Sequence, residues 1–200
     1  ELSILSTLFE FTVSNNLISG TFPPEYAALT DLDTFVASFN QFEGPVPGFF
    51  FRFPDMVYLD FAYNKFSGTL PQDIPSRMPD LQVLFMENNQ IGGTIPENLG
   101  ELNLRRVHMD DNLLEGTIPA SMGNPPRLQQ LYMHNNKLQG QIPDSLKNLE
   151  ILKEATFHYN NLDGDVSNSI CENMYQKQLS TFSVDCPIVG CECCTCGEPT

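Results

Sequence analysis

Residues 128–143 read LQQLYMHNNKLQGQIP, and this stretch decides the fold. Apolar residues there follow the spacing φ-x-x-φ-x-φ, where φ is apolar, and Asn136 comes three residues after the last of them. The alternation over Leu131 and Met133 predicts a short β-strand with one buried face. Gly140 and the proline after it then impose a turn and forbid a long helix. Each such unit is therefore a strand followed by a return segment.

The same unit recurs along the chain at a nearly constant interval. Asparagines that open an N-x-φ-x-G motif are separated by 24, 24, 25, 23, 24 and 24 residues. They are Asn16, Asn40, Asn64, Asn89, Asn112, Asn136 and Asn160. A proline follows in phase in six units, and Ser167 takes its place in the seventh. A fixed period of this length predicts a solenoid of about seven stacked coils.

These asparagines have a predicted structural role. Where the chain leaves each strand and turns inward, backbone N–H and C=O groups are left that neither the sheet nor water satisfies. A buried side-chain amide carries donors and an acceptor that satisfy them. Stacking the coils is expected to arrange the seven amides as a ladder.

The repeat resembles the leucine-rich repeat, and the L-x-G-x-I-P extension, as in NLLEGTIP at residues 112–119, resembles the plant-type subclass. The resemblance covers residues 2 to about 170. It implies an α/β repeat solenoid, a right-handed superhelix with a parallel β-sheet on its concave face and short helical turns on the convex side. It also implies recognition on the concave face, as in extracellular receptors or inhibitors. The chain departs from the family where Phe and Met replace leucines, and where the paired-cysteine N-terminal cap of plant proteins is missing.

The chain divides into two predicted parts. Residues 1–170 hold about seven 24-residue repeats, and residues 171–200 form a cysteine-rich C-terminal cap. Leu2 and Leu5 fit the tail of an earlier coil, so the N-terminal end is expected to be truncated. Leu179, Phe182 and Val184 repeat the strand spacing once more, which predicts an eighth, terminating strand.

All six cysteines lie in the last thirty residues, at Cys171, Cys186, Cys191, Cys193, Cys194 and Cys196. Their even number beside the last strand predicts three disulfides that close the final coil. A zinc thiolate cluster and free or mixed thiols are the alternatives, although structural zinc sites more often use separated C-x-x-C pairs. The arrangement resembles the cysteine-rich C-termini of leucine-rich repeat proteins in diatoms and related algae. Disulfides imply an oxidising compartment, so a secreted or cell-surface location is expected.

Composition and motif searches narrow the function. A net charge of -15 opposes binding to nucleic acid or anionic lipid. The longest apolar run, near residues 49–53, is far shorter than the about 20 residues that cross a bilayer, so no direct membrane insertion is expected in this fragment. No dinucleotide, P-loop, H-E-x-x-H or G-x-S-x-G motif occurs. We therefore expect neither catalysis nor a cofactor.

Candidate binding residues lie between the buried positions of each strand, where side chains point to the concave face. The predicted ligand-binding set is Tyr58, Tyr63, Phe85, His108, Asp110, Tyr132, His134, His158 and Tyr159. Neighbouring strands lie about 4.8 Å apart, so His134 and His158 should be adjacent, with Asp110 next in the same row. A composite patch of His, Asp and Tyr results.

Three interpretations of this patch remain open. It is a solvated sheet surface, a contact site for a protein, peptide or glycan, or a metal or catalytic site. A metal site is disfavoured because His134, His158 and Asp110 would have to converge although side chains in one row run parallel. Asp110 and Asp111 are expected to face opposite ways, which argues against a carboxylate pair.

Two functions follow from different classes. The first is an extracellular, receptor-like recognition module that holds a protein or polysaccharide partner on the concave face. The second is a structural or adhesive component of a cell wall or extracellular fibre, with a role in cell adhesion, built by self-association of the solenoid. Ice binding would need a regular row of Thr or Asn, and the columns of outward residues are too varied for it.

Overall fold

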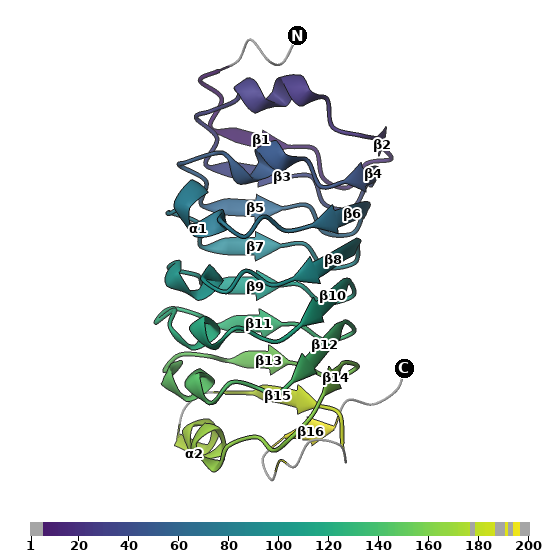
Figure 1. Ribbon diagram of the computed structural model, residues 1–200. Coiled ribbons are helices and arrows are strands. Elements are labelled where there is room, and N and C mark those ends of the chain that lie inside the picture. The colour runs from purple at the N-terminus through teal and green to yellow at the C-terminus, as the bar shows by residue number, and fades with distance from the viewer. Residues whose placement is uncertain (1–5, 177–178, 187–190, 192–193, 197–200) are drawn as a thin grey trace.

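The structure, a computed structural model, describes residues 6–176, 179–186, 191 and 194–196. Successive coils stack along one axis, and two columns of strands run the length of the stack (Figure 1). Helical turns occupy the remaining side of each coil. A coil therefore consists of a strand of a first sheet, a turn, a strand of a second sheet and a short helical return.

The first sheet is parallel and has nine described strands in the order β1-β3-β5-β7-β9-β11-β13-β15-β16. They are β1 (Glu10–Thr12), β3 (Thr34–Val36), β5 (Tyr58–Asp60), β7 (Val83–Phe85), β9 (Arg106–His108), β11 (Gln130–Tyr132), β13 (Glu154–Thr156), β15 (Thr181–Val184) and β16 (Thr195–Cys196). Equivalent residues of neighbouring coils face each other, as His108, Tyr132 and Thr156 do. This confirms the predicted parallel sheet of a leucine-rich repeat solenoid. We call the surface formed by the side chains between its buried positions the open face.

A second parallel sheet, not predicted from the sequence, follows the first in every coil. Its strands are β2 (Ser19–Gly20), β4 (Gln41–Pro45), β6 (Lys65–Thr69), β8 (Gln90–Thr94), β10 (Leu113–Gly116), β12 (Lys137–Gly140) and β14 (Asn161–Leu162). The glycine of each N-x-φ-x-G motif has a φ between 74° and 87°, a conformation that glycine adopts without steric cost. The chain therefore turns there and still pairs with the neighbouring coil.

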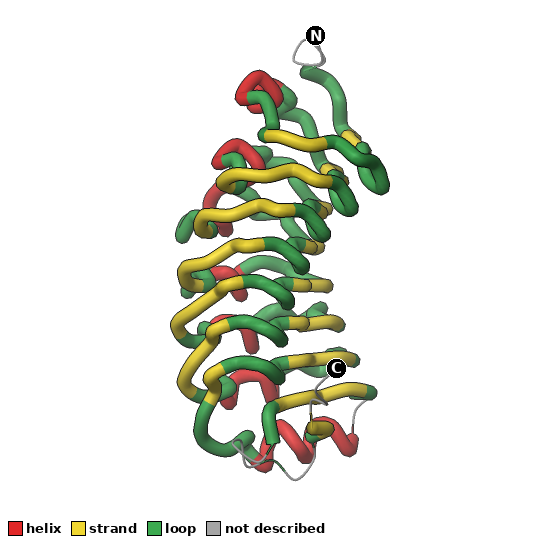
Figure 2. The backbone as a smooth tube through the Cα atoms, turned by 90° about the vertical axis from the view of Figure 1, so that its right-hand side faces the viewer, coloured by secondary structure: helices red, strands yellow, loops and turns green. Residues whose placement is uncertain are grey.

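Short helical segments complete the coils, as predicted, and lie together on one side of the stack (Figure 2). They are the 3-10 helices η2 (Pro24–Ala28), η3 (Gly48–Phe51), η4 (Leu99–Glu101), η5 (Ala120–Gly123) and η6 (Asp144–Asn148), and the α-helices α1 (Ile74–Arg77) and α2 (Asn168–Gln176). They pack closely, because a Cβ atom added at Gly100 would lie 1.8 Å from the carbonyl oxygen of Ser121. Among the described residues, no helix has the length and apolar character that crossing a membrane requires.

One continuous apolar core runs between the two sheets and the helical side. In the first coils it is built largely from phenylalanine rings, with 4.2 Å between the ring centroids of Phe22 and Phe42. Leu84 and Leu131, in later coils, are fully buried. Burying such a side chain stabilises a fold by roughly 1.5–3 kcal/mol. Phenylalanine supplies in the first coils the buried apolar contacts that leucine supplies in later coils, and the path of the backbone stays the same.

The asparagine ladder joins consecutive coils. From Asn40 to Asn160, each side-chain Nδ2 donates to a carbonyl oxygen of the preceding coil at 2.9–3.1 Å. Each Oδ1 accepts an N–H from the preceding coil at 2.9–3.0 Å. Asn16, in the first described coil, is exposed, and its side-chain amide donates within its own coil, to Val13 and Ser14.

The cap closes the C-terminal end of the stack. Phe182 and Val184 of β15 are buried, and β16 extends the sheet by a strand that the sequence did not predict. Disulfides join Cys186 to Cys196 and Cys191 to Cys194. Cys171 is also disulfide-bonded. Cys193, like Leu2 and Leu5 at the other end, lies outside the described residues.

Asp185 ends the backbone hydrogen bonding of the last full coil. Its two carboxylate oxygens accept the N–H groups of Tyr159 at 2.8 Å and Asn160 at 3.1 Å. In earlier coils the equivalent N–H groups donate to carbonyl oxygens of the next coil, as Asn135 does to His158. The carboxylate of Asp185 thus takes the place of the backbone carbonyl oxygens that accept these bonds in earlier coils.

Candidate functional site

Flat rings form a continuous row at the middle of the open face. Phe85, His108 and Tyr132 are equivalent residues of β7, β9 and β11, and both successive pairs stack with centroids 4.2 Å apart. Tyr58 meets the edge of Phe85 at 5.7 Å. Strand spacing of about 4.8 Å sets the 4.2 Å separations, because rings at one register position in a parallel sheet lie one above another. Tyr58 instead pairs with Val83, two residues before Phe85. We call these four residues the ring row.

Polar groups hold the rings of the ring row in place. The imidazole Nε2 of His108 lies 3.3 Å from Oε1 of Gln130, whose Nε2 donates to the Tyr132 hydroxyl at 3.3 Å. The Tyr132 hydroxyl in turn donates to the Glu154 carboxylate. Burial, followed by this hydrogen bond, raises the pKa of Tyr132. The phenol therefore stays protonated and its orientation is fixed.

Titratable groups occupy the neighbouring row, which comprises Glu87, Asp110, His134 and His158 and which we call the acid–histidine row. His134 and His158 stack at 4.6 Å. Nδ1 of His134 lies 2.9 Å from the Thr156 hydroxyl, and Nδ1 of His158 lies 2.8 Å from the Ser183 hydroxyl. Burial lowers the pKa of both histidines from the ordinary value of 6.5. Both rings are therefore neutral at pH 7.

Asp110 of this row is buried and Glu87 is partly buried, and one carboxylate oxygen of each lacks a partner among the described residues. Asp110 is only 6% exposed, and burial raises its pKa to about 7. Asp110 Oδ1 and Glu87 Oε2 have no hydrogen-bond partner within the described part of the chain. A buried polar atom without a partner costs roughly 1–3 kcal/mol, so such atoms mark positions where a ligand would be stabilising.

A row of residues in the left-handed backbone conformation borders the open face. Seven of them, with φ of 52–57°, directly precede the ladder asparagines: Asn15, Phe39, Tyr63, Asn88, Asp111, Asn135 and Tyr159. These residues lie beyond the strands, so the strict alternation of side chains no longer applies to them. Phe39 and Tyr63 stack here at 4.2 Å.

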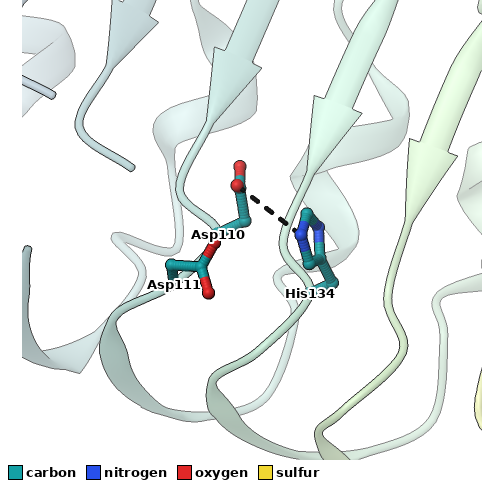
Figure 3. Close-up of side chains that lie close together, drawn as sticks. All are labelled: Asp110, Asp111 and His134. Atoms are coloured by element: carbon teal, nitrogen blue, oxygen red, sulfur yellow. Dashed lines mark ion pairs between the residues drawn. The ribbon is translucent and has the colours of Figure 1, made fainter. Parts of the chain in front are cut away.

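This conformation overturns the expectation that Asp110 and Asp111 face opposite ways. One ligand atom from each of Asp110, Asp111 and His134 lies within 4.8 Å of the others. Figure 3 shows the two carboxylates and the imidazole next to one another. The expectation was wrong because Asp111, with a φ of 52°, has already left the strand. His158, the third member of the group considered from the sequence, is not part of this cluster.

Comparison with known protein families agrees with the repeating coils of the fold. The family model described as Leucine Rich Repeat matches residues 55–76, 80–102 and 127–149. The chain is built from leucine-rich repeats. No curated protein is a significant match to it in sequence.

Solved plant receptors share the architecture of these leucine-rich repeats. The plant peptide hormone receptor RGFR1 in complex with RGF2 is 30% identical, with a TM-score of 0.83 over 92% of this chain. The GASSHO1/SCHENGEN3 ectodomain from Arabidopsis thaliana, in complex with CASPARIAN STRIP INTEGRITY FACTOR 2, is 30% identical, with a TM-score of 0.80 over 91%. A TDR receptor is 28% identical, with a TM-score of 0.78 over 86%. This chain spans 30%, 21% and 30% of those three chains.

The leucine-rich repeat framework distributes the nine predicted ligand-binding residues over three rows. Tyr58, Phe85, His108 and Tyr132 make up the ring row, Asp110, His134 and His158 belong to the acid–histidine row, and Tyr63 and Tyr159 lie in the left-handed row. Asp111, Glu87 and Glu154 were not in the predicted set, although they contact it. The sequence could have indicated these three residues, because they occupy the same positions of the repeat as residues of the predicted set.

Proposed function

We propose that this leucine-rich repeat chain is an extracellular recognition module, without catalysis, that binds a peptide segment with positive charge along its open face. The observation that carries the proposal is the stacked ring row lying beside buried acids.

The ring row offers apolar contact area that is already ordered. Aromatic residues are enriched among those that dominate binding energy at interfaces. The side chains of Phe85, His108 and Tyr132 are stacked and only partly buried, so a partner gains contact with little further loss of side-chain entropy. An extended peptide laid across the strands would follow this row.

The acid–histidine row favours cationic groups. The chain carries a net charge of -15, and Glu87 presents a buried oxygen without a partner in the described residues. The guanidinium of Arg106 lies 5.2 Å from the centroid of Phe85, so a cation is already accommodated over this ring. Lysine or arginine side chains of a partner would be attracted and held here.

The solved neighbours support a peptide partner. Two of the three compared structures are receptors in complex with RGF2 or with CASPARIAN STRIP INTEGRITY FACTOR 2. The disulfides of the cap support an oxidising, extracellular or cell-surface location. The resemblance of the cap to algal proteins stays a prediction.

Selection from a library of displayed random peptides tests the proposal. We expect enriched peptides to carry Lys or Arg and to lose at least tenfold in affinity for a variant with Phe85→Ala, His108→Ala and Tyr132→Ala. The matched control replaces three exposed apolar residues elsewhere, Leu17→Ala, Leu113→Ala and Ile151→Ala, and should bind like wild type. Equal binding by both triple variants, with unchanged thermal unfolding, would remove the ring row from the site. Selective retention of glycans instead of peptides would favour a polysaccharide partner.

Self-association is a second candidate, favoured by the first described coil. Phe9 and Leu17 are 63% and 83% exposed there. A cavity of about 290 Å³ beside them is lined by apolar side chains, among them Phe11, Phe22 and Tyr26. Light scattering over a hundredfold range of concentration separates the two candidates, because assembly would raise the mass with concentration and recognition would not.

A further inference from the structure

We propose that Asp110, Asp111 and His134 form a binding site for one divalent transition-metal ion of the zinc type. Asp110 and His134 also belong to the acid–histidine row of the proposed function, but the inference rests only on the geometry of these two residues and of Asp111. Nitrogen and carboxylate ligands in this combination are those that Zn²⁺ accepts, with a water molecule completing the coordination.

The spacing of the cluster matches a shared ion better than direct contacts. His134 Nε2 lies 3.7 Å from Asp110 Oδ2, which is too long for a hydrogen bond. Two ligands that each lie about 2.1 Å from a tetrahedral ion are separated by about 3.4 Å, which is close to this distance. All three ligand atoms lie within 4.8 Å of one another, so each pair would have to approach by at most about 1.4 Å to reach the tetrahedral spacing.

Asp110 supplies an independent sign of a missing ligand. The residue is 94% buried, since its exposure is 6%, and its Oδ1 has no partner among the described residues. Figure 3 shows its carboxylate directed toward the space beside His134. Leaving a carboxylate oxygen unsatisfied in a buried position is costly, and a cation bound by both oxygens of Asp110 would remove that cost, with Oδ2 the oxygen nearer His134.

Hydrogen bonds to neighbouring residues already orient the other two ligands, His134 and Asp111. Nδ1 of His134 lies 2.9 Å from the Thr156 hydroxyl, and when this nitrogen donates, Nε2 presents its lone pair toward Asp110. The Asn88 amide donates to one oxygen of Asp111 at 3.3 Å, and the Asn135 amide donates to the other. Such second contacts fix the orientation of metal ligands in known sites. The imidazole disfavours Mg²⁺ and Ca²⁺, which prefer oxygen ligands.

Titration with Zn²⁺ alone tests the site. The 200-residue chain, with disulfides intact and no affinity tag, is treated with EDTA, dialysed and titrated with ZnCl₂ in a calorimeter. We expect one saturable site per chain, with affinity at least tenfold lower in Asp111→Asn and in His134→Gln. Asparagine at position 111 keeps the size of the side chain and removes its charge, so the turn is preserved.

Two matched variants serve as controls. His158→Gln removes the imidazole stacked on His134, and Asp55→Asn removes an exposed carboxylate far along the chain; both should bind Zn²⁺ within twofold of wild type. Circular dichroism in EDTA checks that each variant is folded. The proposal is overturned if wild type shows no saturable site, if either Asp111→Asn or His134→Gln binds like wild type, or if His158→Gln loses as much affinity as His134→Gln.

Discussion

The side-chain amide of Asn112 donates a hydrogen bond of 2.9 Å to the carbonyl oxygen of Met86, one coil earlier in the chain. The same nitrogen donates at 3.0 Å to the carbonyl oxygen of Asp110 in its own coil. Its Oδ1 accepts the N–H of Ile91 at 3.0 Å. One side chain thus satisfies backbone groups of two coils, directly behind the acid–histidine row. The ladder therefore positions the candidate site as well as stabilising the stack.

Replacement of Asn112 by alanine should destabilise the chain strongly. The variant leaves the N–H of Ile91 and the carbonyl of Met86 without partners in a buried place, which costs about 2–4 kcal/mol. Urea unfolding followed by circular dichroism measures this loss. Asn16→Ala is the control, because the Asn16 side chain is exposed and its amide donates to Val13 and Ser14 of its own coil, and its cost should stay under about 1 kcal/mol. Equal losses in the two variants would contradict the role of the ladder between coils.

Close packing of the helical side predicts a cost for Gly100→Ala. The new Cβ would lie 1.8 Å from the Ser121 carbonyl oxygen, so the backbone of one coil must move. We expect a loss of about 3 kcal/mol in unfolding free energy. Gly48→Ala meets no atom within 4 Å and should be neutral or stabilising by up to about 1 kcal/mol. A tolerated Gly100→Ala would show that adjacent helical turns are separated more widely than described.

Asp185→Ala should weaken the C-terminal end. The N–H groups of Tyr159 and Asn160 lose their acceptors, and because Asp185 is partly exposed, water recovers some of that energy. We expect a loss of about 1–2 kcal/mol and faster amide exchange confined to the last coils. Asp163→Ala, an exposed acid in the same region, should change neither quantity. Exchange that accelerates uniformly along the chain would argue against a local cap.

Asp60 makes stability depend on pH in a defined direction. Burial raises the pKa of Asp60 above its ordinary value of 3.8. The folded chain then binds this proton more tightly than the unfolded chain, so its contribution to stability is lost as pH rises from about 4 through the folded pKa. Asp60→Asn keeps an acceptor for the Ala62 N–H and a partner for Ser38, and it carries no charge.

Unfolding in urea at pH 4, 6 and 8 tests this direction. The stability of Asp60→Asn relative to wild type should increase across the series, because only wild type ionises the buried carboxyl. A difference that shrinks as pH rises would mean that the carboxylate form is favoured in the fold. Because the wild type and the variant are compared at each pH, the contributions of titrating groups that do not interact with Asp60 cancel.

The nearly constant interval between repeats in the sequence made the first sheet predictable. Regular spacing of apolar residues, asparagine and glycine places Phe85, His108 and Tyr132 at one register position, and a parallel sheet must then stack them. The second sheet was not predictable in the same way, because the short extended segments before Gly116 and Gly140 show little alternation of their own. Pairing with neighbouring coils, and not local propensity, makes them strands.

The cluster of Asp110, Asp111 and His134 was not predicted, because of the backbone conformation of Asp111. Alternation along a strand was extended one residue too far, to Asp111, where φ is 52°. The sequence carries a weak signal for this, since Asn and Asp tolerate the left-handed region, but Phe39, Tyr63 and Tyr159 occupy the equivalent position and obscure it. The hydrogen-bonding role of Asp185 was likewise hidden, because its side chain accepts bonds that backbone carbonyl oxygens accept in earlier coils.

Each repeat strand of the first sheet pairs in register with its neighbour, and each strand of the second sheet pairs with a constant shift, which makes length an adjustable property of this scaffold. A complete coil inserted between two others would meet the same ladder bonds above and below, and both ends of the molecule would be left as they are. Each insertion would lengthen the binding surface by about 4.8 Å, one strand spacing. Evolution or a designer could thus match the surface to a longer or shorter partner by counting coils, without inventing a new core.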